Sequence, residues 1–379
     1  MKISILCFDL SDNAAGRAHL LAQLLAPIAE VEVVGPRHGP DVWPPVAADG
    51  VRYVGVPVGR LPRFAGAVPA LLRAADGDLL YASKPRLGSA GIGHLKRLIG
   101  RRPLLLDIDD WEVGFFLRGG AWGTLGRALN LSNPRGLPWT WLMERAVRAA
   151  DGVTVASRFL QQRFGGVLIP HVRDTDAWRP GMTDPGEIRK QLGFSDERIV
   201  MFLGTAREHK GVDDLVAAIA GLQRLDVALA LVGTDPESAT GRRLRACLPG
   251  LRLVPPVPFA EVPRFLEAAD VVAIPQRDGP DTRGQVPAKL FDAMALGRPI
   301  VATRVSMIPE ILDGCGLVVP AGDPAMLRAA IERLLDDPLE AQGFGFRART
   351  RCVERYSFTA ARRDLFPLVT RLVDRLAHR

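Results

Sequence analysis

The sequence predicts an α/β protein with a mostly parallel sheet in each of two domains. Short apolar strands alternate with helical patterns through both halves of the chain, which is typical of parallel sheets covered by helices. The chain of 379 residues exceeds one ordinary domain, and a hydrophobic fraction of 47% is enough for two buried cores. A polar, proline-punctuated stretch at 180–186 indicates a linker. We therefore expect domains over 1–180 and 181–355, followed by a terminal helix over 356–379.

The first half contains five stretches with the apolar character of buried strands: 2–8, 31–34, 79–82, 103–108 and 153–157. A turn with Gly16 leads from the first strand into a helix, and a lone glycine permits close approach of a ligand but is weak evidence for it. A further helix is predicted around 92–99. The tract 113–141 is rich in glycine, proline and aromatic residues, so it forms either an acceptor-binding lobe or packed core.

The second half repeats the alternation. We expect strands over 199–203, 227–232, 251–254, 271–274 and 299–303. Helices are expected over 213–222, 241–247, 260–268 and 324–336, and another from Pro287 to a stop at Gly297. The last helix begins near Ser357 and is expected to kink at Pro367.

Composition limits the function classes. The four cysteines stand far apart with no CxxC pair, so neither a zinc site nor a disulfide framework is indicated. The amino-terminal stretch meets Asp9 and Asp12 too early for a signal peptide, and no apolar run approaches the ~18 residues of a membrane span. We expect a cytoplasmic protein.

Of the net charge of +7, six charges arise in the first half, where residues 1–180 hold 22 Lys and Arg against 16 Asp and Glu. No zinc-finger spacing or aromatic RNA-binding strand accompanies this charge, so no nucleic-acid partner is expected. The segment 84–102 interleaves basic and apolar residues. Such a segment either contacts an anionic membrane surface or is an ordinary solvated helix face.

The stretch 283–303 is the strongest candidate for a binding site. A glycine-bearing loop runs into the helix at Pro287, and the free amides of a helix start attract an anion. Lys289 and Asp292 stand on its first turns. The arrangement suits the diphosphate and ribose of a sugar nucleotide, although an ordinary loop, helix and strand of an α/β domain would have the same pattern.

Two other strand ends carry candidate residues. The strand 199–203 runs into Gly204, after which Arg207 and Lys210 are placed to neutralise a diphosphate. The strand 103–108 ends in the acidic run DIDDWE, and carboxylates at the carboxyl end of a parallel strand suit sugar hydroxyls as hydrogen-bond acceptors.

The second half strongly resembles glycosyltransferase family 4, the retaining enzymes with the GT-B fold. The resembling pieces occur in family order and cover residues 200–337: FLGTAREHKG, AADVVAIP, KLFDAMALGRPIVA and PEILDGCGLVVPAGD. ADGVTVASRFL and IPHVRD resemble the family's inter-domain region more loosely. The resemblance implies two Rossmann-like domains that face each other across a cleft, with a final kinked helix that returns to the first domain.

The resemblance also implies roles for single residues. Lys210 matches the diphosphate-binding lysine, and Asp292 matches the second glutamate of the paired-glutamate motif, which holds the ribose. The loop 255–259 matches the base-reading segment, and Gly16 the glycine turn of the first domain. The implied donor site comprises Gly16, Gly204, Thr205, Arg207, Lys210, Pro256, Val257, Arg283, Gly284, Gln285, Val286, Pro287, Ala288, Lys289 and Asp292. The implied catalytic residues are Asp109, Asp110, Arg207 and Lys210.

Three positions depart from the family pattern. Thr205 stands where many members have the first diphosphate arginine, so Arg207 is expected to supply that charge. Gly284 replaces the glutamate that contacts the transferred sugar. Asp109, followed by Asp110, replaces a histidine near the anomeric centre.

These observations predict a cytoplasmic glycosyltransferase that needs no metal or other cofactor, because protein cations stabilise the leaving diphosphate. It moves a hexose-type sugar from a nucleoside-diphosphate donor to a hydroxyl acceptor, which either carries a phosphate or a lipid anchor or is an ordinary soluble compound. A sugar-nucleotide epimerase or a phosphorylase of the same fold is an alternative, as is a non-catalytic two-lobed sugar-binding protein. A nicotinamide-dependent enzyme is disfavoured, since no GxGxxG follows the first strand.

Overall fold

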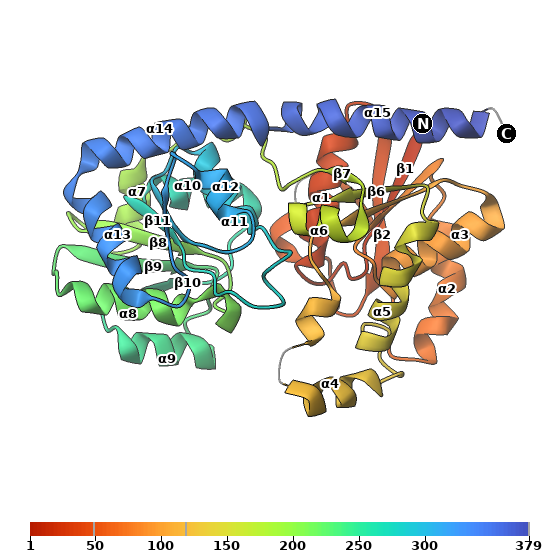
Figure 1. Ribbon diagram of the computed structural model, residues 1–379, viewed down its shortest axis with the longest axis horizontal. Coiled ribbons are helices and arrows are strands. Elements are labelled where there is room, and N and C mark those ends of the chain that lie inside the picture. Colours follow the sequence, from red (N-terminus) through yellow and green to blue (C-terminus); the bar gives the residue numbers. More distant parts are fainter. Residues whose placement is uncertain (48–49, 118–119, 378–379) are drawn as a thin grey trace. The chain divides into compact units, whose positions relative to one another are not determined.

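The structure is a computed structural model that describes residues 1–47, 50–117 and 120–377, and for residues 120–122, 125 and 375–377 it describes the backbone only. The chain divides into two compact units, each with its own parallel sheet (Figure 1). Unit 1 comprises Met1–His171, Arg283–Gln285 and Ala361–Arg379, and unit 2 comprises Val172–Thr282 and Val286–Ala360. From the sequence, the boundaries were predicted at 180–181 and 355–356.

Unit 1 contains a seven-stranded sheet in the order β3-β2-β1-β4-β5-β6-β7, with every neighbouring pair parallel. Its strands are β1 (Lys2–Leu6), β2 (Glu30–Arg37), β3 (Arg52–Pro57), β4 (Leu79–Ser83), β5 (Leu104–Ile108), β6 (Gly152–Val155) and β7 (Val167–Leu168). Its helices are α1 (Ala14–Leu25), α2 (Arg63–Ala74), α3 (Ile92–Gly100), α4 (Gly120–Ala128), α5 (Leu137–Ala146) and α6 (Arg158–Phe164).

The central strands of unit 1 form because their residues are apolar on both faces. All five residues of β4 and of β5 are buried, as expected where helices cover a parallel sheet from both sides. In Figure 1, α1 lies on one side of this sheet and α2, α3 and α5 lie on the other. The strand order reverses beside β1, so the carboxyl ends of β1 and β4 mark the position where open α/β sheets bind ligands.

Unit 2 contains a six-stranded parallel sheet in the order β10-β9-β8-β11-β12-β13. Its strands are β8 (Arg198–Leu203), β9 (Val227–Val232), β10 (Arg252–Val254), β11 (Val271–Ile274), β12 (Ile300–Thr303) and β13 (Leu317–Val319). Its helices are α7 (Pro185–Gln191), α8 (Val212–Leu222), α9 (Ala239–Cys247), α10 (Val262–Glu267), α11 (Ala288–Ala295), α12 (Ile308–Leu312), α13 (Pro324–Asp336) and α14 (Pro338–Arg355).

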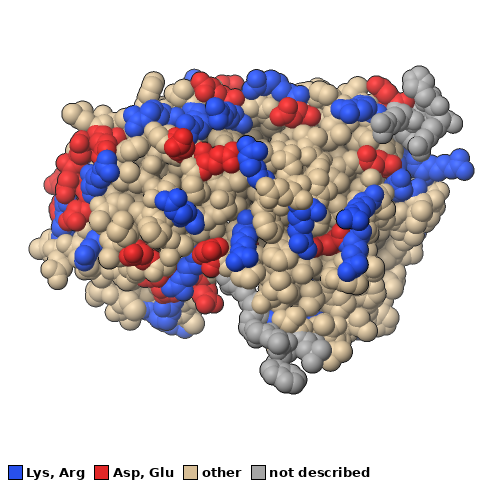
Figure 2. Space-filling view, viewed as in Figure 1, with Lys and Arg blue, Asp and Glu red and all other residues tan. Residues whose placement is uncertain are grey.

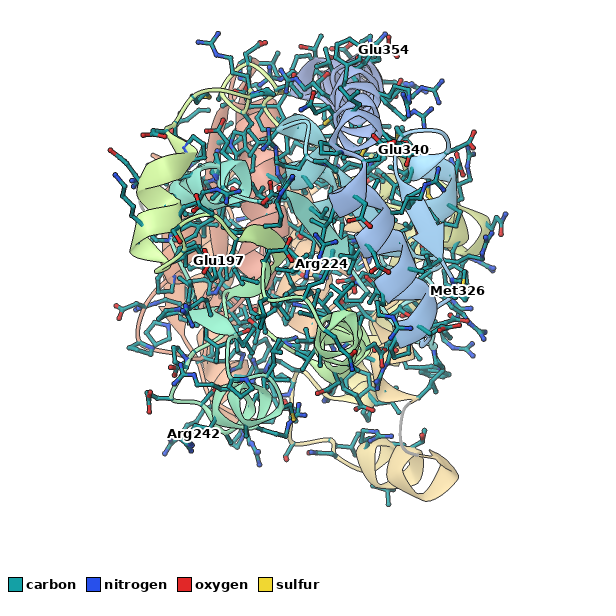
Figure 3. All side chains as sticks on the ribbon, turned by 90° about the vertical axis from the view of Figure 1, so that its left-hand side faces the viewer. Glu197, Arg224, Arg242, Met326, Glu340 and Glu354 are labelled. Atoms are coloured by element: carbon teal, nitrogen blue, oxygen red, sulfur yellow. The ribbon has the colours of Figure 1, made fainter. Side chains whose placement is uncertain are left out.

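The core of unit 2 forms where these strands and helices pack against one another. Apolar residues of β8, β9, β11, α8 and α13 form one buried cluster, and α11 packs against α14 elsewhere in the unit. Polar and flexible side chains cover its outside: Arg242 on α9 and Met326 on α13 point away from the core (Figure 3).

The last helix, α15 (Phe358–Ala377), begins in unit 2, and its residues from Ala361 onward belong to unit 1. Arg362 donates hydrogen bonds to the carbonyl oxygens of Gln23 and Leu24 at the end of α1. The helix continues through Pro367. Within the described part of the chain, no helix combines the length and apolar character needed to cross a membrane.

Several local expectations were wrong. The predicted linker 180–186 lies inside unit 2, where Asp184 caps α7 through its hydrogen bond to the Gly186 amide. Pro287 is the residue before α11 rather than its first residue. Other elements were not predicted at all, namely β3, β7, β13, α2, α4, α5, α7, α12 and α14.

Candidate functional site

Two lysines converge at the carboxyl end of β8. The chain turns at Gly204, which has a φ of +107°, and continues into a short 3-10 turn, Glu208–Lys210. The position that a Cβ on Gly204 would occupy lies 3.5 Å from the Nζ atoms of both Lys210 and Lys289. Thr205 and Arg207 are exposed on the same loop. Two cations brought this close together favour a ligand with more than one negative charge.

Lys289 sits in an environment that disfavours its own charge. Its Nζ lies 3.5 Å from the centroid of the Phe202 ring. Burial, and then the charge of Lys210, lower the pKa of Lys289 well below its ordinary value. A bound anion would offset both effects, because a nearby negative charge favours the protonated form of a lysine.

The start of α11 adds backbone donors to the same place. Pro287 precedes the helix, and no side chain caps its first turn. Val286 and Pro287 are buried, while Ala288 is half-buried. Because the first amides of a helix have no intrahelical partners, this turn suits an anion.

Asp292 lies on the second turn of α11 and is 6% exposed. Its Oδ1 accepts a short hydrogen bond from Nε of Arg173, which is also buried. Burial raises the pKa of Asp292, and the neighbouring Arg173 opposes that rise. Arg173 was not predicted as a site residue, because 119 positions separate the two partners in the sequence.

The predicted base-reading loop follows β10. Pro256 is exposed and Val257 is half-buried, so the loop is accessible to a ligand. Phe259 is the last residue of the loop, and its ring centroid lies 4.9 Å from that of Trp178.

The tripeptide Arg283–Gln285 belongs to unit 1, not to the unit that holds Lys289. Arg283 is exposed, while the carbonyl oxygen of Gly284 accepts a 2.8 Å hydrogen bond from Ser157 Oγ. A Cβ on Gly284 would lie 3.1 Å from Trp111, so a side chain at this position would be tightly packed.

Gly16 differs from its predicted place. It lies in the first turn of α1 rather than in a turn before the helix, and a Cβ there would lie 3.3 Å from the Trp43 ring.

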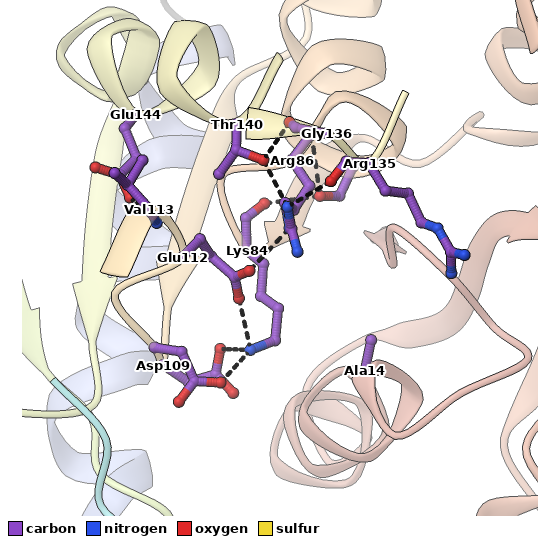
Figure 4. A network of polar contacts seen from close by, with 12 residues as sticks. Ala14, Lys84, Arg86, Asp109, Glu112, Val113, Arg135, Gly136, Thr140 and Glu144 are labelled. Carbon is purple, nitrogen blue, oxygen red and sulfur yellow. Dashed lines mark hydrogen bonds and ion pairs between the residues drawn. The ribbon is translucent and has the colours of Figure 1, made fainter. Parts of the chain in front are cut away.

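Three carboxylates surround one lysine in unit 1 (Figure 4). Lys84 follows β4 directly, and its Nζ lies 2.8 Å from Asp109 Oδ1, 2.5 Å from Asp110 Oδ2 and 2.9 Å from Glu112 Oε1. Arg86 pairs with the second oxygen of Glu112 at 2.8 Å. Among the described residues, Asp109, Asp110 and Glu112 are the one group spaced to hold a metal ion, and Lys84 contacts all three.

Asp109 and Asp110, the two predicted catalytic carboxylates, differ in pKa within this cluster. Burial raises the pKa of Asp109 to about 7, and the charge of Asp110 adds to that rise. Burial would also raise the pKa of Asp110, but Lys84 and a 2.9 Å hydrogen bond from Gln285 Nε2 hold it below its ordinary value. Asp109 is therefore the carboxyl group placed to exchange a proton near neutral pH.

Asp107, the first acid of the run DIDDWE, has a different role. Both of its oxygens bind Arg17, with distances of 2.9 Å and 2.8 Å, and Oδ1 also accepts a hydrogen bond from Thr154. This fully buried pair joins α1 to the sheet, so Asp107 has no oxygen directed at a ligand.

The predicted residues thus form two groups. Unit 2 holds Gly204, Thr205, Arg207, Lys210, Pro256, Val257, Val286, Pro287, Ala288, Lys289 and Asp292, whereas unit 1 holds Gly16, Asp109, Asp110, Arg283, Gly284 and Gln285.

Two stretches of the chain match two different family models. Residues 197–337 match the family model for glycosyl transferases group 1, and residues 14–173 match that for the glycosyl transferase 4-like domain. The alpha-maltose-1-phosphate synthase of Mycolicibacterium smegmatis is 32% identical over 70% of this chain and 72% of its own length. The D-inositol 3-phosphate glycosyltransferase of Acidothermus cellulolyticus is also 32% identical, but the match covers 46% of this chain and only 41% of that protein.

Solved structures show the same fold. Sucrose-phosphate synthase from Thermosynechococcus elongatus superimposes with a TM-score of 0.76 at 21% identity, over 98% of this chain and 99% of the other. Anabaena Alr3699/HepE, in complex with UDP-glucose, gives 0.77 at 19% identity over the same shares. The two parallel sheets, together with the similarity to these solved structures, show that the chain has the GT-B fold. The two family models and the match to the maltose-1-phosphate synthase establish that the chain belongs to glycosyltransferase family 4 and is a glycosyltransferase.

Proposed function

We propose that the protein transfers a hexose-type sugar, with retention of configuration, from a nucleoside-diphosphate donor to a hydroxyl acceptor. The observation that carries this proposal is the convergence of Lys210 and Lys289 over Gly204, beside the uncapped start of α11. The leaving group of such a donor is a diphosphate, and its developing charge requires cations and amides that are already in place. The exposed Arg207 stands on the same loop.

No metal or other cofactor is proposed. In unit 2, the charge that a divalent ion supplies in other transferases comes from Arg207, Lys210 and Lys289. In unit 1, the Lys84 ammonium lies among the three carboxylates at 2.5 to 2.9 Å, where a divalent ion would otherwise bind them. Adding a chelator should leave turnover unchanged.

The acceptor is proposed to be a phosphate-bearing or lipid-linked hydroxyl compound, used in the cytoplasm with peripheral contact to an anionic membrane. The names of several relatives support this class, including D-inositol 3-phosphate glycosyltransferases and a GDP-mannose-dependent phosphatidylinositol monomannoside mannosyltransferase of Mycobacterium tuberculosis. Asp109 is proposed to orient the reacting hydroxyl, since its carboxylate has the higher proton affinity of the pair.

The test has two stages. Thermal-shift screening with UDP, GDP, ADP and their sugar conjugates identifies the donor, because a ligand at 100 times its Kd adds about 2.7 kcal/mol of stability. The donor is then incubated with inositol phosphates and with phosphatidylinositol lipids, and the anomeric configuration of the product is determined by NMR. Transfer with retention is expected. Isomerisation of the donor alone would favour an epimerase, phosphate-dependent cleavage a phosphorylase, and binding without turnover a sugar-binding protein.

A further inference from the structure

We propose that Arg173 is a positioning residue for the donor nucleotide, which holds the ribose-binding carboxylate Asp292 and the end of the base-reading loop at Phe259 in one fixed arrangement. The inference rests on the proposed use of a nucleoside-diphosphate sugar. It adds a residue that lies more than a hundred positions away from α11 in the sequence.

The first observation is how Arg173 divides its hydrogen bonds. Its Nε donates to Oδ1 of Asp292, and its second contact is a 2.6 Å hydrogen bond from an Nη atom to the carbonyl oxygen of Val172. The hydrogen bond and ion pair that Arg173 forms with Asp292 are both made to Oδ1. The arginine therefore fixes the carboxylate through one oxygen and leaves the other for a ribose hydroxyl.

The second observation is the aromatic contact of the same guanidinium. Its central carbon lies 5.2 Å from the ring centroid of Phe259 and 5.5 Å from that of Trp178. The two rings also contact each other. Cation–π contacts of this kind are strongest where water is excluded, and Arg173 is 5% exposed. One buried side chain thus links the predicted ribose and base sites.

The third observation is that the backbone of Arg173 is itself fixed. Its amide donates to the carbonyl oxygen of Tyr356 at 3.0 Å, and its carbonyl accepts from the amide of Phe358 at 2.9 Å. The Tyr356 ring in turn packs edge-on against Phe291, the residue before Asp292. The backbone of Arg173 is therefore held at its amide and at its carbonyl, which fixes the position from which the guanidinium reaches Asp292.

The chemistry explains why the site needs this arginine. A carboxylate accepts hydrogen bonds from ribose hydroxyls well only when it is ionised and correctly oriented. Burial opposes ionisation of Asp292, and Arg173 is the charge-assisted partner that offsets part of the effect of burial. Without it, Asp292 would take up a proton or turn away, and it would no longer distinguish ribose from deoxyribose.

Isothermal calorimetry with UDP, GDP and ADP and with their 2′-deoxy analogues tests the inference on wild type, Arg173→Met, Asp292→Asn and the double variant. Because Arg173→Met loses a charge-assisted contact, it should weaken binding of the preferred ribonucleotide roughly 10- to 100-fold. It should also reduce the ratio between the affinities for the ribonucleotide and for its 2′-deoxy analogue. The double variant should bind no more weakly than Asp292→Asn alone, since the two residues act as one unit.

Arg189→Met is the matched control. Arg189 forms a 2.8 Å ion pair with Asp270 in the same unit, so its loss should lower the melting temperature without changing nucleotide affinity. If Arg173→Met does not fold, Arg173→Lys decides the question: it keeps a charge near Asp292 but cannot keep the planar fork, and it should recover only part of the ribose preference.

A folded Arg173→Met or Arg173→Lys protein with the wild-type ribose preference would overturn the inference and leave the donor proposal intact. Failure of the wild type to bind any of the nucleotides would overturn both.

Discussion

Lys210 and Arg207 are the residues for which the structure most directly predicts a loss of turnover. A preorganised cation beside a leaving group is typically worth ~10²–10³ in rate, so Lys210→Ala and Arg207→Ala should each reduce kcat by about that factor. Lys210→Ala should also raise the pKa of Lys289, because the charge of Lys210 contributes to its depression. Steady-state kinetics with the identified donor checks the first effect.

Arg242→Ala provides the control for these variants. Arg242 projects from α9 on the outside of unit 2 (Figure 3), and its loss should leave turnover unchanged. Near-normal activity of both Lys210→Ala and Arg207→Ala would mean that the diphosphate binds elsewhere.

Asp109 predicts a pH dependence near neutrality. With a pKa of about 7, its carboxylate is half ionised there, so kcat/KM should rise with pH through about 7 as the group becomes able to orient the acceptor hydroxyl. Asp109→Asn should remove this limb. Asp110→Asn should move it to lower pH, because the charge of Asp110 raises the pKa of Asp109.

The same pKa shift also affects stability. Whereas kcat/KM is expected to rise with pH, the stability of the folded state is expected to fall. The folded-state pKa of Asp109 lies above its ordinary value of 3.8, so the contribution of this group to stability is complete below about 3.8, falls as the pH rises from there to about 7, and is lost above about 7. Asp109→Asn should therefore raise the melting temperature relative to wild type at pH 8, and this difference should shrink as the pH is lowered from 7 toward 4. A wild-type melting temperature that exceeds the variant's at pH 8 would contradict this assignment.

At the scale of residues, the sequence predicted groups that follow a strand or open a helix, and it did not reveal their partners. The places of Lys210 and Lys289 followed from local pattern, because strand ends and helix starts leave signals in neighbouring residues. Lys84 was instead assigned to a basic surface segment, and that assignment was wrong. Its side chain is buried among Asp109, Asp110 and Glu112, a contact that depends on strand order rather than on local spacing.

At the scale of elements, apolar periodicity was a sufficient guide where a helix or strand buries large side chains. The helix α14 was not predicted because it packs through small residues, with Ala341, Gly345, Ala348 and Cys352 on its buried side. A Cβ on Gly345 would lie 2.1 Å from the carbonyl oxygen of Gly297. The strand β3 was not predicted because it is an edge strand with only half-buried side chains between exposed ends.

Gly211 connects the lysine-bearing turn to α8 and gives a prediction about that connection. Its φ is +65°, and a Cβ there would lie 1.8 Å from the carbonyl oxygen of Pro275. Left-handed backbone costs a non-glycine residue ~1–2 kcal/mol, and overpacking adds typically ~1–3 kcal/mol. Gly211→Ala should therefore lower the melting temperature severely and displace Lys210.

Gly314→Ala separates backbone strain from steric clash. Gly314 has a similar φ of +69°, but among the described residues nothing lies within 4 Å of the position that a Cβ would occupy. Gly314→Ala should lose only the backbone contribution to the free energy of unfolding. Each kcal/mol of that loss lowers the melting temperature by roughly 2–4 °C in a domain of 150–250 residues. Equal losses measured by calorimetry for both variants would show that the Pro275 contact relaxes.

At the scale of the whole molecule, the position of one short segment could not be predicted. Arg283–Gln285 belongs to unit 1, although the chain on both sides of it belongs to unit 2. The family resemblance predicted this stretch as part of the donor site, and a linear pattern contains no signal for a tripeptide that packs with a different sheet. The two-sheet architecture itself was predictable, because it follows from the alternation of strands and helices along the chain.

The basic side chains do not form one continuous surface on the face that Figure 2 draws. On the face that Figure 2 draws, Lys and Arg are interspersed with Asp and Glu. Within the segment 84–102, Arg97 forms a two-pronged pair with Asp151, Arg102 binds Asp78, and Lys96 donates to a backbone carbonyl. These cations are already engaged within unit 1, so they contribute less to membrane binding than their number suggests.

The end of α3 is therefore the part of this segment expected to contact an anionic membrane. Leu98 and Ile99 are 75% and 68% exposed, and Arg101 is exposed beside them. One basic side chain near such a surface contributes about 1 kcal/mol and is screened by salt, and buried apolar side chains add to it. We expect weak co-sedimentation with anionic liposomes at low salt, and none with neutral liposomes or at high salt.

Two variants locate the contact. Leu98→Ser, Ile99→Ser and Arg101→Gln together should abolish pelleting, since they remove the exposed apolar and basic groups at the end of α3. Lys96→Gln, Arg97→Gln and Arg102→Gln together should keep most of it, because those three side chains are held by partners within unit 1. The reverse order of effects would place the contact on the charged face of α3. Negligible pelleting of the wild type under every condition would leave a soluble acceptor as the remaining interpretation, because a lipid-linked substrate requires the enzyme to reach the bilayer surface.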